Sequence, residues 1–339
     1  MKKIMAAAIS MVITNAVAAQ TDTAKKSTTV LIWSLDAYYR YDFNDAPAAT
    51  NNLTSFTNSK NSFELGMVSV RADHSFGKVS ATADLGFGKR AQDFSYHDAN
   101  TSAAVKQLLI SYAPSSAVKL TIGKWATHIG YEMVDAYLNR NYSMSYAFSY
   151  GPFFHTGIRA DISLGGKSAC MIGVANPTDF STTTSPVKLL IAQFSTGTAN
   201  DKLKAFFNFQ GGTGLNQFDL VLNALLGTRF SIAYDGTIST VKKGTVQDSW
   251  SANALYFNYD PSKILGLTLR SEYFSDNKNV TGIGTSVVQT TLSGNIRINN
   301  LTVIPEIRMD HAGATIFSKN TGTGTANATS FIVAAVYKF

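Results

Sequence analysis

The chain has 339 residues, a formal net charge of +7, 15% charged and 12% aromatic residues. Its basic residues are spread singly or in adjacent pairs along the sequence, which excludes the clustered footprint of a nucleic-acid-binding protein. With one cysteine, Cys170, the chain can form no internal disulfide, so this thiol is interpreted as a small buried or lipid-facing group.

Residues 1–19 have the organisation of a signal peptide. Lys2 and Lys3 precede an apolar run over residues 4–17, and small residues follow it at Ala18 and Ala19. The run is too short and too often interrupted by polar residues for a spanning helix, which needs about twenty apolar residues. We predict cleavage at or one residue before Gln20 and a single exported domain over residues 20–339, with a charge of +5 once the two lysines are lost (+7 − 2).

The first strand of the mature chain is predicted from a period-two pattern. Between Thr28 and Phe43 the odd positions from Leu31 onward are apolar or aromatic, whereas the even positions include Asp36, Arg40 and Asp42. This period predicts a strand with one apolar and one polar face. The apolar face starts and ends in aromatic residues, as a lipid-facing strand requires, and only helices or closed barrels can span a bilayer.

The same alternation recurs along the whole chain. It is found over residues 79–87, 157–164, 202–209, 265–272, 292–298 and 330–339. Between Phe63 and Phe76 the pattern changes phase near Ser69, where we expect a β-bulge. The pattern is typical of an all-β chain of many amphipathic strands.

The connections alternate between short turns and longer polar loops. Short turns are predicted near residues 76–78, 113–116, 165–167, 197–202, 227–228, 260–263 and 299–300, and longer loops near 44–61, 91–104, 129–154, 176–186, 211–214, 239–245, 275–284 and 313–327. Seven turns and eight loops predict a transmembrane antiparallel β-barrel of about sixteen strands, with fourteen or eighteen left open. A barrel of this size leaves an aqueous channel.

The last ten residues resemble the final strand of outer-membrane barrels. Phe331, Val333, Ala335 and Tyr337 share one face with the terminal Phe339. The resemblance implies recognition of this strand by the barrel-assembly machinery. The alternative is an ordinary edge strand of a soluble sheet, which would expose an apolar edge.

Alternation also predicts which charged side chains line the lumen wall. The cations are Arg40, Arg159, Lys202, Lys204, Arg270, Arg297 and Arg308, and the acids are Asp36, Asp42, Asp84, Asp161, Glu272, Glu306 and Asp310. The balance argues against strong ion selectivity. Alternatively, neighbouring opposite charges only neutralise one another and stiffen the wall.

The longest loop, residues 129–154, is the third outer loop and is expected to fold into the lumen. Glu132, Asp135 and Arg140 are candidates for a pore constriction, in which the acids face Arg140 and wall cations across the pore. In the alternative, Glu132 is bonded to loop backbone or barrel wall and holds the loop inward. A surface loop without a gating role is a third possibility.

The sequence gives little sign of a cofactor, a metal centre or an enzyme. His128 and His155 bracket the long loop at a spacing that matches no metal motif. His74 and Ser75 are adjacent and so lie on opposite faces of a strand, and no Gly-x-Ser-x-Gly elbow exists. Calcium on the Asn- and Asp-rich outer loops is left open.

The long loop and its flanks carry a resemblance to a known family. The residues are Gly123, Lys124, Gly130, Tyr131, Glu132, Asn139, Asn141, Tyr142, Ser143, Ser145, Gly151, Pro152, His155, Thr156 and Gly157, followed by Gly173, Val174 and Asn176. This stretch resembles the OmpL-like β-barrel porin family of Gram-negative outer membranes, including those of Bacteroidetes. The resemblance implies a passive outer-membrane channel.

We therefore predict an outer-membrane porin that passes small hydrophilic solutes by diffusion, in contact with outer-membrane lipid and needing no cofactor. A homotrimer is consistent with this, without an interface signature. The alternative is a closed or plugged barrel that serves as an adhesin, a binding protein or a structural protein of the outer membrane.

Overall fold

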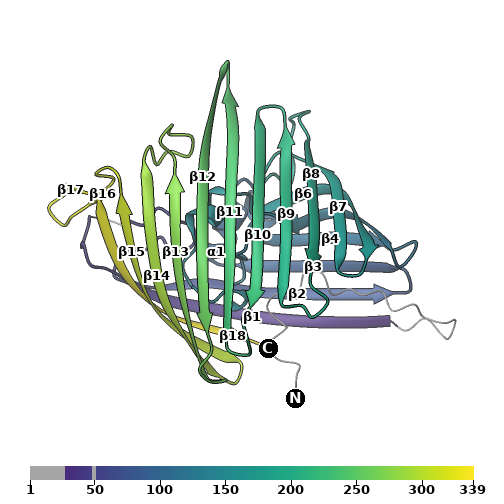
Figure 1. Ribbon diagram of the computed structural model, residues 1–339, viewed down its shortest axis with the longest axis horizontal. Coiled ribbons are helices and arrows are strands. Elements are labelled where there is room, and N and C mark those ends of the chain that lie inside the picture. Colours follow the sequence, from purple (N-terminus) through teal and green to yellow (C-terminus); the bar gives the residue numbers. More distant parts are fainter. Residues whose placement is uncertain (1–26, 48–50) are drawn as a thin grey trace.

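The computed structural model describes residues 27–47 and 51–339, so the predicted signal peptide lies outside the described residues. Within these ranges sixteen strands form one closed antiparallel barrel, as predicted. The strands are β1 (Ser27–Asp42), β2 (Ser62–Phe76), β3 (Val79–Phe87), β4 (Val105–Tyr112), β5 (Val118–Ala126), β6 (Phe154–Gly165), β7 (Ser168–Ala175), β8 (Leu189–Gly197), β9 (Leu203–Gly212), β10 (Leu215–Leu225), β11 (Phe230–Lys243), β12 (Val246–Tyr259), β13 (Leu265–Ser275), β14 (Ser286–Ile298), β15 (Leu301–Ala312) and β18 (Asn327–Lys338). Strands of the front and rear walls cross steeply in Figure 1, as tilted barrel strands do.

Within residues 27–47 and 51–339, helical structure is confined to the connections. The helices are α1 (Lys89–Phe94), α2 (Tyr146–Tyr150) and two short 3₁₀ turns, Asn100–Ala104 and Ala136–Leu138. Two short strands, β16 (Phe317–Ser318) and β17 (Gly324–Thr325), pair within the last loop. In the described part of the chain, no helix is both long and apolar enough to cross a membrane.

The barrel closes between its first and last strands. β18 pairs with β15 on one side and with β1 on the other, from Ser34 opposite Lys338 to Asp42 opposite Ser330. At the end of the seam Trp33 and Phe339 exchange backbone hydrogen bonds of 2.9 and 3.0 Å, and their rings stack. The alternative of a soluble edge strand is wrong, because β18 has a partner on both sides.

The predicted alternation of faces is present in the strands. On β1 the even positions from Ser34 to Asp42 are buried, whereas Leu31 is 58% exposed on the opposite face. The outward faces of the other strands carry exposed apolar residues in the same way, such as Ile122 and Phe218. A belt of this extent is far larger than the apolar patches of soluble monomers and is suited to lipid.

The predicted bulge lies three residues before the expected position. Asp36 pairs with Met67 and Ala37 pairs with Leu65, which leaves Gly66 as the extra residue of β2. A Cβ at Gly66 would overlap the carboxylate of Asp36. The bulge therefore sits where only glycine makes room for an inward acid.

The seven short turns agree with prediction, but two of the predicted longer loops do not. β9 and β10 are joined by two residues after Gly212, and β11 and β12 by two residues after Lys243. The polar residues near both turns belong to paired strands, and the β11–β12 hairpin rises above the rest of the wall in Figure 1. Polarity there reflects exposed strand ends rather than loops.

Candidate functional site: the third loop inside the barrel

The connection between β5 and β6, residues 127–153, lies across the barrel interior. Its residues bond to inward-facing side chains on β1, β4, β10, β11, β13, β14 and β15. Residues 141–148, which include the first three residues of α2, are all buried. We call residues 127–153 the lumen loop.

The lumen loop is first held at its start by β9, β10 and β11. The His128 ring donates from Nε2 to the carbonyl of Phe209 at 3.1 Å, and burial lowers the pKa of His128 to about 4, so the ring is neutral. The amides of Gly130 and Tyr131 then donate to Asp219 and Asp235 at 3.1 and 3.0 Å. Two wall carboxylates thus fix the direction in which the loop enters the lumen.

The middle of the lumen loop is bonded through its backbone to β14 and β15. The carboxylate of Glu306 accepts the amides of Tyr142 and Ser143 at 2.8 and 3.1 Å, and a third bond from the Ser293 hydroxyl. Ser293 in turn accepts a bond from the Asn141 side chain at 2.6 Å. The bonds that the Glu306 carboxylate accepts are charge-assisted, and such bonds are about twice as strong as neutral ones.

A second acid, Glu272 on β13, repeats this arrangement one step further along. It accepts the amides of Tyr146 and Ala147 at 2.8 and 2.7 Å. These are the first amides of α2, which have no partner inside the helix. The acid therefore supplies what the helix start lacks, while the preceding Ser145 caps the amide of Phe148.

Wall arginines bind the carbonyl groups of the same segment. Arg270 donates to the carbonyl of Ser143 at 2.7 Å, and Arg308 donates to that of Met144 at 2.7 Å. Both guanidinium groups are also paired with acids, since Arg308 is bonded to Asp310 and Arg270 to Glu132. The wall of β13 to β15 thus recognises the loop mainly through its backbone.

The three predicted constriction residues are not brought together. Glu132 pairs with Arg270 at 2.6 Å and accepts the amide and hydroxyl of Ser145. Asp135 pairs with Lys106 on β4 at 2.5 Å. In the described ranges no salt bridge joins either acid to Arg140.

Arg140 is placed near the turn end of the lumen. Its guanidinium group forms two bonds with Asp260 at 3.0 and 3.1 Å, and Asp260 also accepts from Arg297 at 2.8 Å. Although burial acts to raise it, these bonds hold the pKa of Asp260 below its usual range. The geometry supports the alternative in which Glu132 holds the loop inward, rather than a field of facing charges across an open pore.

The connection between β3 and β4, which contains α1, packs against the lumen loop. Arg90 of α1 donates to the carbonyls of Val134 and Tyr142 and lies over the rings of Tyr142 and Phe56, 4.7 and 5.0 Å from their centres. The Tyr142 hydroxyl donates to Asp36 at 2.5 Å. These contacts tie the lumen loop to β1 and to the connection between β3 and β4.

Most predicted wall residues do face inward. Those on the strands near the lumen loop are buried, namely Arg40, Asp84, Arg270, Glu272, Glu306, Arg308 and Asp310, together with Asp36 and Asp42. Four others lie near the turn ends of their strands and are partly exposed, namely Arg159, Asp161, Lys204 and Arg297. The prediction is wrong for Lys202, which is exposed in the turn before β9, because the alternation begins one residue later than assumed.

Several anchoring residues were missed. Asp219 and Asp235 face inward on β10 and β11, and Lys106 is the extra residue at a register shift between β3 and β4. Alternation around Phe218 and Ile238 would have found the two acids. Lys106 has no comparable signal, because the shift breaks the period-two pattern.

The charged groups of the lumen form two regions. Near the lumen loop, Arg270 and Glu132 have side-chain exposures of 0% and 4%. Toward the turns, Arg71 and Asp73 show 23% and 32%, and Lys119 and Asp161 show 31% and 33%. The turn end of the lumen is a polar vestibule, whereas at the level of the loop each described barrel strand has at least one buried inward side chain.

Metal-binding groups do not gather in the lumen. In residues 27–47 and 51–339 there is no group of three or more His, Cys, Asp or Glu side chains placed to hold a metal ion. His128 and His155 pack ring against ring, with their centres 5.0 Å apart. Cys170 is a free, half-buried thiol on β7.

Comparisons with known proteins agree with the fold. No curated protein matches the chain in sequence at a significant level. Solved structures match over most of both chains: the anion-selective porin of Comamonas acidovorans (12% identity, 93% and 100% covered, TM-score 0.61), the trimer form of Vibrio cholerae OmpT (12%, 92% and 99%, 0.59) and Salmonella typhi OmpF with daunomycin (10%, 92% and 97%, 0.60). The family model described as "Putative beta-barrel porin-2, OmpL-like" matches residues 33–339. The chain therefore belongs to this OmpL-like family of β-barrel porins of Gram-negative outer membranes.

Proposed function

We propose that the protein passes small hydrophilic solutes by passive diffusion, through a lumen that the loop of residues 127–153 narrows. The observation that carries this proposal is the set of hydrogen bonds to the loop backbone. Glu272 and Glu306 accept from loop amides, and Arg270 and Arg308 donate to loop carbonyls. A loop held from the wall in this way stays in the path of any solute.

The mechanism follows from the two regions of the lumen. Solutes from the turn end enter a vestibule with partly exposed charges of both signs, such as Arg159, Asp161 and Arg297. They then meet the lumen loop, where charged groups are already paired and offer few free partners. Passage is therefore limited by the size of the gap beside the loop more than by a selective charge.

A closed barrel is the second candidate, favoured by the burial of inward side chains around the barrel at the height of the loop. In that case the outer loops would act as a binding surface and the lumen would not conduct. The two functions differ in one observable, which is the passage of ions through the folded barrel.

Single-channel conductance in planar bilayers, with a salt gradient across the membrane, separates these functions. The diffusion proposal expects stable small steps with weak ion preference, because charges in the lumen are largely paired. The absence of steps from verified folded barrel would exclude diffusion and favour the closed form. Chromatography with light scattering tests the homotrimer, for which the trimer form of OmpT is a structural precedent.

The proposal includes export and assembly. Residues 1–19 would be removed as the signal peptide, which the N-terminal sequence of the mature protein tests. The barrel-assembly machinery would recognise β18 together with Phe339, the residue that follows it. Deletion of Phe339 should reduce the amount of folded barrel in the outer membrane without changing synthesis.

A further inference from the structure

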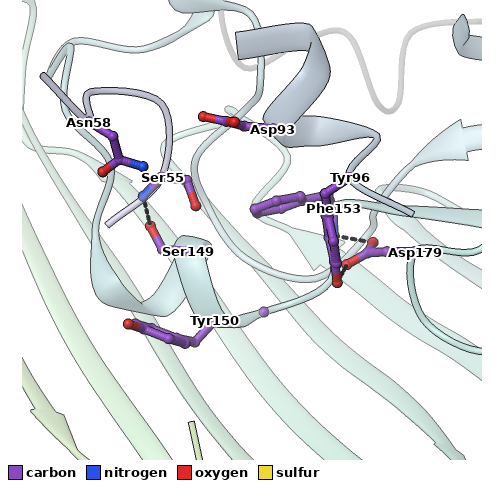
Figure 2. A pocket seen from close by; sticks show the side chains of 9 residues that line it. Ser55, Asn58, Asp93, Tyr96, Ser149, Tyr150, Phe153 and Asp179 are labelled. Atoms are coloured by element: carbon purple, nitrogen blue, oxygen red, sulfur yellow. Dashed lines mark hydrogen bonds between the residues drawn. The ribbon is translucent and has the colours of Figure 1, made fainter. Parts of the chain in front are cut away.

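A cavity of about 370 Å³ lies at the loop end of the barrel, on the outer side of the lumen loop (Figure 2). Its lining comes from four connections: the loops between β1 and β2, β3 and β4, β5 and β6, and β7 and β8. This volume falls in the range of small-molecule sites, about 300–1,000 Å³. A solute arriving from the loop end would contact residues 149–153 of the lumen loop in this hollow.

The two sides of the cavity differ in chemistry. Figure 2 shows Asn58, Ser55 and Ser149 along one side, and the rings of Tyr96 and Phe153 along the other. The ring of Tyr150 forms the lower wall. A ligand that fits must therefore combine a polar edge with an apolar face.

The two tyrosine rings of the cavity are fixed by their own hydroxyl groups. Tyr150 donates to the carbonyl of Leu53 at 3.0 Å, and Tyr96 donates to Asp179 at 3.0 Å. Ser149 accepts the amide of Ser55 at 3.0 Å, which joins two of the loops. Because these groups are already bonded, the cavity is formed before any ligand binds, which reduces the entropic cost of binding.

Several polar groups at the cavity remain without a partner. The Oδ2 atom of Asp93 is buried and accepts no hydrogen bond. Among the described residues, the side-chain amide nitrogen of the exposed Asn58 and the hydroxyl of the half-buried Ser55 bond to no protein group. A ligand that both donates and accepts hydrogen bonds would satisfy them, and such groups discriminate strongly when left unpaired.

The charges around the cavity are largely compensated. Lys89 donates to Asp93 Oδ1 at 2.6 Å, and Asp179 accepts the amides of Phe153 and Phe154 at 2.7 and 2.9 Å. Burial raises the pKa of Asp179 to about 7, so this carboxyl group is partly neutral at pH 7. The cavity has no strong net charge to attract an ion.

We propose that this cavity binds a small neutral polyhydroxylated solute, of the saccharide class, at the outer mouth of the channel. The C–H face of a sugar ring would pack on Tyr150 and Tyr96, while its hydroxyl groups would donate to Asp93 and accept from Asn58. The assignment of this solute as the transported one rests on the proposed diffusion function.

Saturation-transfer NMR tests the proposal on the folded protein in micelles of a detergent without a sugar headgroup. D-Glucose is the probe, and choline is the cationic comparison. We expect saturable glucose binding that weakens about tenfold in Asp93→Asn, as loss of a hydrogen bond to a buried group implies, and by a smaller factor in Asn58→Ala, because Asn58 is exposed. Asn320→Ala, an exposed asparagine of a separate outer hollow, is the matched control and should bind as the wild type does.

Three results would overturn the saccharide site. These are no glucose binding by the wild type, glucose binding by both cavity variants as strong as that of the wild type, or saturable binding of choline in place of glucose. Channel conductance is measured separately on the same preparation. Steps without glucose binding would reject this site and leave diffusion intact. Glucose binding that the cavity variants weaken, without steps, would support the site and reject diffusion.

Discussion

The two ends of the lumen both contain pairs of arginine with an acid, but the pairs differ in their exposure. At the loop end Arg270 pairs with Glu132 with almost no exposure, and Arg308 pairs with Asp310 at 3% and 7%. At the turn end Arg71 pairs with Asp73 while both remain partly exposed. Ion pairs at the loop end hold the lumen loop in place, whereas ion pairs at the turn end line the lumen and remain partly exposed.

The difference has an energetic consequence. Removing one partner of a buried pair leaves an uncompensated charge, which costs about 3–5 kcal/mol, whereas an exposed pair contributes about 0–1 kcal/mol. Equivalent substitutions at the two ends should therefore have unequal effects.

The largest effect is expected for Arg270→Gln, which leaves Glu132 buried without its cation and removes the bond to the Ser143 carbonyl. The loop should detach, and chymotrypsin should cleave the folded barrel within residues 131–150 at a markedly higher rate. Arg71→Gln, at the turn end, is the matched control and should leave cleavage unchanged. Equal protection in both variants would show that the buried pair does not hold the loop.

A smaller effect is expected for Glu272→Gln. The amide oxygen can accept from only one of the two helix amides with good geometry, so about 1.5–3 kcal/mol of local stability should be lost. Hydrogen exchange at Tyr146 and Ala147 should accelerate while exchange in the barrel strands is retained. Asp161→Asn serves as the control, and protection that is identical in the two variants would argue against the clamp.

A pH dependence is expected from Asp179, whose pKa is raised to about 7 by burial. Between its ordinary value, about 4, and 7 the folded site holds a proton that the opened site releases. Local stability at residues 153–154 should therefore fall as pH rises through this range and level off above 7. Hydrogen exchange at pH 5 and 8, corrected for intrinsic rates, measures it, and Asp179→Asn should abolish the dependence.

The smallest effect is expected for Arg297→Gln at the turn end. Asp260 keeps its bidentate bond from Arg140, so stability should change by at most about 1 kcal/mol. The ion preference of the channel should shift toward cations, because one vestibule cation is lost. Reversal potentials under a salt gradient report this, and a loosened loop in this variant would contradict the division into two regions.

The barrel was predictable because successive side chains of a lipid-facing strand must alternate between an apolar outward face and a polar inward face. The same rule placed Arg270, Glu272, Glu306 and Arg308 inward. It could not show that they bind the loop, since Glu272 and Tyr146 are 126 residues apart and meet only through the loop path. Bulges and turns limit the rule, as Gly66 and Lys202 illustrate, because each shifts or starts the alternation.

The central claim is that the loop of residues 127–153 limits passage through the barrel. Single-channel conductance of the wild type and of a variant lacking residues 137–149, both verified as folded, tests it most directly. We expect larger steps in the deletion variant, because the segment held by Glu272 and Glu306 is gone. Unchanged conductance in the folded variant would contradict the claim.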